Sequence, residues 1–418
     1  MSKIRYKATK INKVNLAKLK ARIAGQALVF SIDVAQHGMV GLLSVTGSNE
    51  AVQLVSWQHP TQMKELIAFL QALEAESIVV VMEPTGTYGE PLRYQFEQHG
   101  ITVYRVQPKH TYDQAETFDG VPSSHDSKAC FIIADLHHRG RSQLWERESA
   151  QQKTWKSWLS ALDIYQAEHQ ADLNRLHALL AQYWPEFELN ANLDTLSSLH
   201  LLATYSTPAN VADNATAAAE LLKTASRSQL KEPKRQAIIA SAQTTCAEPV
   251  PEGTRQLIQL LARKLLDSHA TIKELETVIS QSIEEKDDLA PMIAMCGKVT
   301  TLMLVAYLGH IGEYEHTQSL LKACGLNLKE HSSGKHKGRL SITKRGNSGV
   351  RFYLYWLAMR MVKNDPNVKA WYERKVARQG GKRKKCALVA VMRKLVKALW
   401  YVARGEPFDS SQLFAAAA

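Results

Sequence analysis

The chain has 418 residues, enough for two or three domains, and its hydrophobic content of 45% and charged content of 22% are typical of a folded, water-soluble protein. No apolar run reaches the roughly 18–20 residues that cross a bilayer, and no secretory leader follows the basic N-terminus, so we expect a cytoplasmic protein without a membrane partner. Five scattered cysteines without a C-x-x-C pair argue against both a zinc site and a disulfide framework, and the net charge of +12 favours a polyanionic partner.

The positive charge is concentrated in two parts of the chain. Residues 1–22 carry +8 and residues 329–404 carry +18, which leaves −14 for the remainder. Basic segments on either side of an acidic central segment are typical of a protein that binds a polyanion at specific places. A membrane surface would attract the same charge, but no amphipathic helix with an apolar, lipid-facing side accompanies it. Nucleic acid is therefore the expected partner.

The first part of the chain is predicted to be an α/β domain over residues 26–145, preceded by a basic arm over residues 1–25 that is partly helical and has few apolar anchors. Three β-rich runs, Ala27–Asp33, Met39–Val45 and Ala51–Trp57, predict an antiparallel meander. Helical and strand patterns then alternate. The resulting order β-β-β-α-β-α-β-α is that of an RNase H-like fold, the fold of RuvC resolvases and many transposases.

Three acids fall at positions where such a fold collects metal ligands. Asp33 ends the first strand, Glu83 ends the fourth strand, and Asp126 lies in the first turn of the last helix. Carboxylate oxygens are the hard ligands that Mg²⁺ prefers, so we predict a Mg²⁺ site formed by these three residues. For each acid taken alone, the plainer interpretation is favoured: a turn residue or, for Asp126, a residue that serves a helix N-terminus. The prediction rests on the three together.

Residues 146–288 are predicted to be helical. Gln151–Leu180 and Thr254–Glu284 have regularly spaced Leu and Ile positions with charges between them, which indicates long or coiled-coil helices. The stretch between them, about 190–251, is rich in Ala, Thr and Ser. We expect it to be an insertion with helices of its own.

Residues 289–418 are predicted to form a mainly helical C-terminal domain that includes a helix-hairpin-helix-like segment. Gly297 precedes an apolar helix, and Gly309 and Gly312 follow it. Glycines of this kind let main-chain N–H groups approach the phosphates of DNA. Ordinary capping of helix ends by glycine explains the same pattern equally well.

The loop from Glu330 to Gly346 is the candidate for covalent chemistry. It places Ser332 and Ser333 before a glycine and among several basic side chains. Fixed cations would hold a phosphate and offset the charge that develops when a serine hydroxyl attacks it. The plainer interpretation is a solvated basic loop with turn serines. The predicted nucleic-acid contacts in this loop and in the last long helix are Lys335, Lys337, Arg339, Lys344, Arg345, Lys382, Arg383, Lys384, Lys385, Arg393 and Lys394.

Several segments together resemble the DEDD-type transposases of the insertion-sequence one-ten family, which includes the Piv-type DNA invertases and the bridge-RNA-guided recombinases. The resemblance spans about 27–140 and 289–410. The matching segments are I-D-V-A at 32–35, M-E-P-T-G-T-Y at 82–88, H-D-S-K-A-C-F-I-I-A-D-L at 125–136, A-C-G-L at 323–326, H-S-S-G-K at 331–335, I-T-K-R-G-N at 342–347, M-R-K-L at 392–395 and G-E-P-F-D at 405–409.

The resemblance implies a DNA transposase or recombinase. Metal held by Asp33, Glu83 and Asp126 would assist attack by Ser333 on a DNA phosphodiester, with a covalent phosphoserine intermediate and strand exchange. It also implies double-stranded donor and target DNA as partners, a bridge-type noncoding guide RNA, and a homo-oligomer, either a dimer or a tetramer. The expected location is the bacterial cytoplasm, in association with the nucleoid.

Two positions depart from the family pattern. Ala129 stands where the family carries its fourth acid, and the loss of that ligand would weaken metal binding. Met295 stands where the first glycine of the hairpin is expected, so the docking turn is altered. The alternatives are a catalytically impaired nucleic-acid-binding relative, which Ala129 favours, and a RuvC-like nuclease that uses water in place of the serine.

Overall fold

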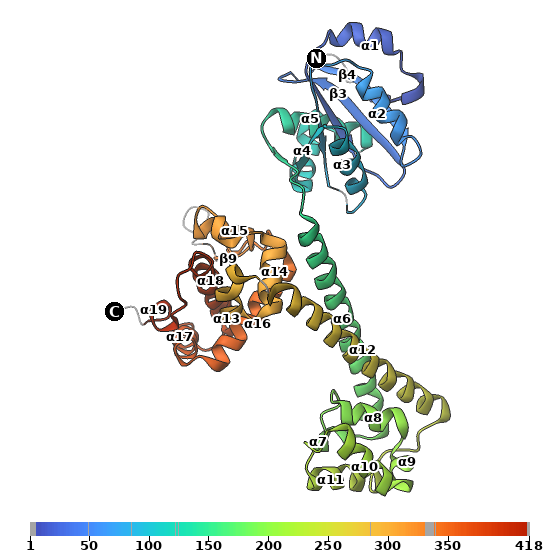
Figure 1. Cartoon of the computed structure of the whole chain (residues 1–418), viewed down its shortest axis with the longest axis vertical. Helices are drawn as coiled ribbons and strands as arrows, with labels where there is room; N and C mark the ends of the chain where they lie inside the picture. The colour runs from blue at the N-terminus through green and yellow to red at the C-terminus, as the bar shows by residue number, and fades with distance from the viewer. Residues whose placement is uncertain are drawn as a thin grey trace. The chain divides into compact units, whose positions relative to one another are not determined.

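The computed structural model describes residues 6–48, 50–84, 86–121, 123, 125–284, 286–330, 338 and 340–415. The chain forms two compact units, Met1–Arg147 and Glu148–Ala418, and each is described by itself (Figure 1).

The first unit contains a seven-stranded mixed sheet in the order β1-β4-β3-β2-β5-β6-β7. In the centre, β2 pairs in parallel with β5, and β5 pairs in parallel with β6, whereas β3 runs antiparallel to both β2 and β4. This arrangement is consistent with an RNase H-like domain. The strands are β1 Thr9–Lys10, β2 Leu28–Asp33, β3 Gly38–Val45, β4 Ala51–Gln58, β5 Ile78–Met82, β6 Thr102–Val106 and β7 Ser142–Leu144.

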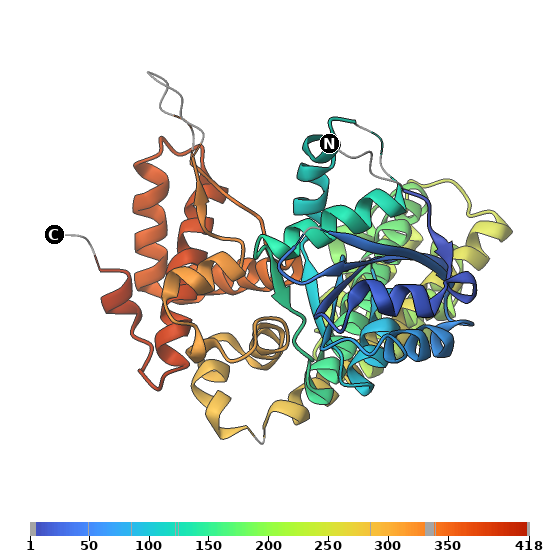
Figure 2. The same cartoon turned by 90° about the horizontal axis from the view of Figure 1, so that it is seen from above.

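Helices cover both faces of this sheet because successive side chains of a strand point to opposite sides. Phe30 and Ile32 of β2 pack with α1, α2 and α3, whereas Val29 packs with α5 on the other face (Figure 2). Both faces of β2 are therefore buried, which explains its nearly continuous apolar sequence. The helices are α1 Leu16–Ile23, α2 Met63–Gln71, α3 Gly89–Gln98, α4 Pro108–Asp119 and α5 Asp126–His138.

The N-terminal segment differs from the arm expected from its charge. Ile11, Leu19 and Ile23 are buried in the same core as the sheet, and β1 pairs in parallel with β4 at the sheet edge. These three residues, together with Val14 and Leu16 packed against the same core, attach the basic segment to the sheet. The pattern also failed to predict α4, whose sequence is mostly polar, and the short edge strand β7.

The second unit is built on two long helices, α6 Ala150–Tyr183 and α12 Glu252–Glu284, which pack side by side (Figure 1). A capping box between Ser149 and Gln152 begins α6, with both reciprocal hydrogen bonds present. The prediction of long helices is confirmed. Five shorter helices between them pack on one part of the pair: α7 Phe187–Asn190, α8 Leu196–Thr204, α9 Pro208–Asp213, α10 Ala215–Ala225 and α11 Glu232–Gln243.

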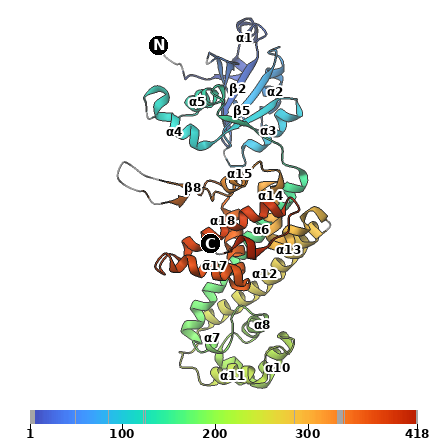
Figure 3. The ribbon, with the colours of Figure 1, turned by 90° about the vertical axis from the view of Figure 1, so that its left-hand side faces the viewer.

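The C-terminal helices pack on another part of the same pair, around a core that includes Trp155 and Leu159 of α6 and Ile279 of α12. A two-stranded antiparallel ladder, β8 Leu328–Lys329 with β9 Ser341–Ile342, projects from them (Figure 3). The helices are α13 Ala290–Cys296, α14 Lys298–Leu308, α15 Thr317–Ala323, α16 Ser348–Asn364, α17 Pro366–Ala377, α18 Lys384–Val402 and α19 Ser410–Leu413.

Gly297 separates α13 from α14. It has a φ of 81°, and its N–H group donates to the carbonyl of Ile293, so it ends one helix and begins the next. This is the capping role that the sequence left open, and contact with DNA phosphates remains a prediction. In the parts of the chain that are described, no single helix is both long and apolar enough to cross a membrane. Only Asp287–Cys296 and Lys298–Leu308, bent by 119° relative to each other, reach that length and composition, and they do so only as a pair.

Candidate functional site

The fold brings Asp33, Glu83 and Asp126 into one neighbourhood of the α/β unit. Strands β2 and β5 are parallel neighbours in which Ile32 pairs with Met82, so Asp33 and Glu83 follow paired residues at the same edge of the sheet. Asp126 is the first residue of α5, which packs against β2. These are the elements on which the sequence placed the three acids.

The three carboxyl groups are close enough for their charges to influence one another. Burial, and after it the negative charges of Asp126 and Glu83, together raise the pKa of Asp33 from 3.8 to about 7, against a hydrogen bond from the backbone of Val34 that lowers it. Charge repulsion of this kind disfavours ionisation of the cluster. A bound divalent cation would offset it, so the donor set suits a hard metal ion.

The carboxylate oxygens of these three acids are not close enough to one another to surround a single ion. Among the residues that the structure describes, only one set of three candidate ligands has all its atoms within 4.8 Å, and that set lies in the helical unit. Ligand atoms around one Mg²⁺ ion, at about 2.0–2.1 Å from it, lie within about 4.2 Å of one another. Binding of an ion by all three acids therefore requires side-chain rotation, which the half-buried Asp33 and Glu83 and the exposed Asp126 permit.

Thr111 is a site residue that the sequence did not reveal. Its hydroxyl donates a hydrogen bond to the Glu83 carboxylate and also lies 3.0 Å from the carbonyl oxygen of Pro108. Thr111 is buried on α4, a helix absent from the predicted elements. A hydroxyl that fixes the orientation of a carboxylate serves a metal site without touching the metal.

A buried lysine fixes the start of α5, where Asp126 lies. The Lys128 ammonium donates to Asp119 Oδ1 at 2.7 Å, to the Val121 carbonyl at 2.6 Å and to the Ser123 carbonyl at 3.1 Å. The hydrogen bond from Lys128, followed by that from Tyr6, lowers the pKa of Asp119 to about 2. The loop before α5 is thereby attached to the helix that presents Asp126.

Ala129 lies one turn after Asp126 on α5, and residues three apart share a helix side. A carboxylate at position 129 would therefore point to the side that carries Asp126. Asp135, the other acid of this helix, lies elsewhere: it is buried, pairs with Arg139 at 2.9 Å and accepts a hydrogen bond from Gln114. Asp135 does not replace the missing acid.

The predicted nucleophile Ser333 lies outside the residues that the structure describes, as do Ser332, Lys335, Lys337 and Arg339. Their roles remain predictions. The two sides of the loop that carries them are described, and they form a defined stem.

The stem joins two segments that the sequence singled out, A-C-G-L at 323–326 and I-T-K-R-G-N at 342–347. Thr343 N–H donates to the Asn327 carbonyl at 2.9 Å, and Lys344 N–H donates to the Gly325 carbonyl at 3.0 Å. Beyond these bonds, Leu328 pairs with Ile342 and Lys329 with Ser341. Both ends of the loop are therefore held together at its base.

Glycine is required where the two segments cross. A Cβ atom on Gly346 would lie 2.3 Å from the carbonyl oxygen of Ala323, and a Cβ atom on Gly325 would lie 2.9 Å from that of Arg345. The Arg351 guanidinium donates to the Gly346 carbonyl at 2.8 Å and fastens the crossing to α16. The side chains of Lys344 and Arg345 remain exposed beside it.

The basic residues of the last long helix fall into two classes. Lys382, Arg383, Lys384 and Lys385 are exposed around the start of α18, as a phosphate contact requires. Lys394 has partners within the protein instead. Its ammonium donates to the Leu413 carbonyl at 2.5 Å and lies 5.3 Å from the centre of the Trp371 ring, and burial lowers its pKa. The half-buried Arg393 precedes it on the helix.

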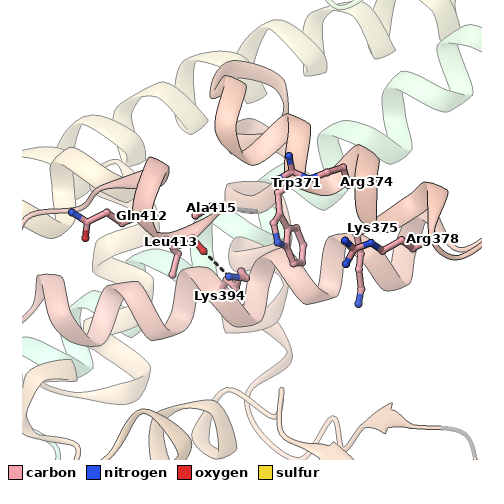
Figure 4. Close-up of a pocket in the computed structure, with 8 residues that line it drawn as sticks. All are labelled: Trp371, Arg374, Lys375, Arg378, Lys394, Gln412, Leu413 and Ala415. Atoms are coloured by element: carbon pink, nitrogen blue, oxygen red, sulfur yellow. Dashed lines mark hydrogen bonds between the residues drawn. The ribbon is translucent and has the colours of Figure 1, made fainter. Parts of the chain in front are cut away.

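Lys394 lies in a pocket of about 390 Å³ between α17, α18 and the C-terminal segment (Figure 4). Three further cations line this pocket: Arg374, Lys375 and Arg378. They are not among the nucleic-acid contacts predicted from the sequence. Arg374 and Lys375 lie near the end of α17, and Arg378 directly follows that helix. Their close spacing is visible in the sequence, but only the packing of α17 against α18 shows that they share a cavity with Trp371. A basic pocket with an aromatic wall suits a nucleotide.

Comparisons with known proteins agree with this geometry. A model of DEDD-type transposases of the IS110 kind matches residues 31–185, and a model described as the transposase IS116/IS110/IS902 family matches residues 291–373. The transposase for insertion sequence element IS1111A of Coxiella burnetii is 28% identical over 152 residues, which cover 35% of this chain and 41% of that protein. The chain thus aligns with less than half the length of this relative. DEDD-type domains generally use divalent metal ions. The two matched regions, in the acidic α/β domain and in the C-terminal domain, occur in the order of the family, and over both of them the chain is similar to the IS110 family of transposases.

Proposed function

We propose that this protein is a DNA transposase that recombines strands by serine attack on DNA phosphodiesters. The observation that carries the proposal is the placement of Asp33 and Glu83 at one edge of the sheet, near Asp126 at the start of α5, in a domain that matches the DEDD transposases. Acids whose charges repel one another at the edge of an RNase H-like sheet are suited to hold divalent metal.

In this proposal Asp33, Glu83 and Asp126 hold Mg²⁺, which supplies electrostatic stabilisation of the charge that develops on the phosphate. Thr111 orients the Glu83 carboxylate through its hydroxyl. Ser333 Oγ bonds to phosphorus while a deoxyribose oxygen leaves, and the resulting phosphoserine ester conserves the bond energy for rejoining. The exposed cations Lys344 and Arg345, at the base of the serine loop, attract the DNA backbone.

The proposed partners are double-stranded donor and target DNA, a bridge-type noncoding RNA and further copies of the chain. The +18 charge of residues 329–404 supports binding of more than one nucleic acid strand. Recombination of two duplexes requires at least two active sites, which supports a dimer or a tetramer.

A covalent adduct tests the mechanism. The chain and its Ala129→Asp variant are incubated with Mg²⁺, duplexes that carry the element ends and the RNA encoded beside them, and the products are separated on a denaturing gel. We expect an adduct that increases in Ala129→Asp, because a fourth carboxylate strengthens metal binding. Ser333→Ala should abolish the adduct in both backgrounds, whereas the neighbouring Ser332→Ala, the matched control, should retain it.

The outcomes separate the alternatives. Cleavage that persists without an adduct in Ser333→Ala would indicate a RuvC-like nuclease that uses water. Binding without cleavage in both the unaltered chain and Ala129→Asp would indicate a catalytically impaired nucleic-acid-binding relative, the second candidate, which Ala129 itself favours.

A further inference from the structure

Three metal-ligating side chains meet in the helical unit, separate from the acids of the proposed catalytic site. His169 lies on α6, His269 on α12, and Asp194 just before α8. Both His169 Nε2 and His269 Nε2 approach the same oxygen, Asp194 Oδ1, at 2.8 and 2.9 Å. The three ligand atoms all lie within 4.8 Å of one another, the only such group in the described part of the chain.

The surroundings of this cluster hold its side chains in place. His169 is 9% exposed, and its second ring nitrogen, Nδ1, lies 3.2 Å from the hydroxyl oxygen of Ser268. Asp194 is positioned by its own loop, in which its N–H group donates to Asn192 Oδ1 at 3.0 Å. The two imidazole rings pack edge to face with their centres 4.6 Å apart. The ligand atoms thus converge from three separate elements whose backbones are fixed by helix packing.

We propose that His169, Asp194 and His269 bind a divalent transition-metal ion, with Zn²⁺ as the best match. Neutral imidazole with one carboxylate is a donor set that suits Zn²⁺ and its neighbours in the first transition row, not Mg²⁺. Ligand atoms of a tetrahedral zinc site lie about 3.3 Å apart, given bonds of about 2.0–2.1 Å. The two imidazole nitrogens, now 2.8 and 2.9 Å from Asp194 Oδ1, would each move outward from that oxygen by about 0.5 Å to reach this separation.

Metal binding and hydrogen bonding require opposite tautomers of His169. Without metal, Nε2–H donates to Asp194 and Nδ1 accepts from the Ser268 hydroxyl. With metal, the Nε2 lone pair binds the ion and Nδ1–H donates to Ser268 Oγ, the orienting contact that metal-bound histidines ordinarily make. Ser268 serves either state, so it does not obstruct metal binding.

A metal here would join α6, α12 and the start of the α8–α11 segment at one point. Metal binding at this place does not depend on the proposed transposase mechanism. The cysteine pattern carries no information on this site, because its proposed ligands are a carboxylate and two imidazoles from residues 100 positions apart in sequence.

The full chain, stripped with a chelator, is titrated with Zn²⁺ in competition with a chromophoric indicator and, separately, with Co²⁺ while its visible absorption is recorded. We expect the unaltered chain to bind one Zn²⁺ ion, to show a visible Co²⁺ band and to unfold at a higher temperature when Zn²⁺ is present. His269→Gln and Asp194→Asn should each lose all three properties. Ser268→Ala should weaken Zn²⁺ binding roughly 10- to 100-fold, as loss of an orienting partner does.

His177→Gln is the matched control, because His177 is also on α6 and also pairs with a carboxylate, Glu188, but has no second imidazole in its cluster. It should bind Zn²⁺ like the unaltered chain. The proposal is overturned if the unaltered chain gives no Co²⁺ band, or if His269→Gln and Asp194→Asn, shown to be folded by circular dichroism, retain the Zn²⁺ affinity of the unaltered chain. Any Zn²⁺ bound by the acids of the α/β unit would survive in these variants and is thereby distinguished.

Discussion

At the scale of single residues, Asp33 carries the clearest electrostatic signal. Its native pKa of about 7 lies above the ordinary value of 3.8, so the native protein binds this proton more tightly than the unfolded chain does. Without metal, the resulting stabilisation is fully present below about pH 4 and is lost as the pH rises through about 7.

We therefore expect the unfolding temperature of the metal-free protein to fall by a few degrees between about pH 5 and about pH 8. Asp33→Asn should reduce this dependence, and Mg²⁺ should stabilise the unaltered chain more at the higher pH, where Asp33 is ionised. Thermal unfolding followed by circular dichroism measures both effects. Asp113→Asn, which alters an exposed acid paired with Lys109, is the control. An unchanged pH dependence in Asp33→Asn would contradict the assignment.

Thr111 offers a second test at this scale. Thr111→Val keeps the shape of the buried side chain and removes the hydroxyl that donates to Glu83. We expect Mg²⁺ affinity to fall roughly 10- to 100-fold because the carboxylate loses its orienting partner. Mg²⁺-dependent thermal shifts measure the affinity. Thr117→Val on the same helix, where the hydroxyl donates only to the Gln114 carbonyl among its described contacts, should leave it unchanged.

At the scale of elements, the stem of the serine loop depends on a glycine crossing. In Gly346→Ala the new methyl group would meet the Ala323 carbonyl at 2.3 Å, and backbone must move to relieve the contact. We expect a loss of about 1–3 kcal/mol in the free energy of unfolding, together with loss of adduct formation. Denaturant unfolding and the adduct gel measure the two effects.

Gly380→Ala is the control for the backbone conformation. Gly380 has a φ of +67°, but a Cβ atom there would meet nothing within 4 Å. This substitution should lower the free energy of unfolding by about 1–2 kcal/mol because of the backbone conformation alone, and adduct formation should be retained. Full activity in Gly346→Ala would show that the crossing does not position the serine loop.

At the scale of the whole molecule, the distribution of charge predicts how DNA binding responds to salt. Lys382→Gln and Lys385→Gln alter exposed cations, so each should reduce the slope of log affinity against log salt by about 0.9 if the residue contacts a phosphate. Lys394→Gln should barely change the slope, because the Lys394 ammonium is bound to the Leu413 carbonyl. Binding titrations at several salt concentrations measure the slopes. Equal slope changes in all three variants would show that Lys394 also faces DNA.

The sequence by itself determined the α/β core, the two long helices and the elements on which Asp33, Glu83 and Asp126 lie. It could do so because strand and helix periodicities are local, and because each of the segments that resemble the family is short and contiguous. Strand β2, Leu28–Asp33, begins one residue after the predicted run Ala27–Asp33 and ends at the same residue.

Only the tertiary structure decided which distant side chains meet. The attachment of the N-terminal segment through Ile11, the hydroxyl of Thr111 beside Glu83, and the internal partners of Lys394 all join residues that no local pattern relates. The same holds for His169 and His269, which are unremarkable in sequence and become neighbours because α6 packs on α12. Periodicity indicates which face of an element is buried, but it does not indicate which other element of the chain packs against that face. The proposed sites depend on those packing contacts between distant elements.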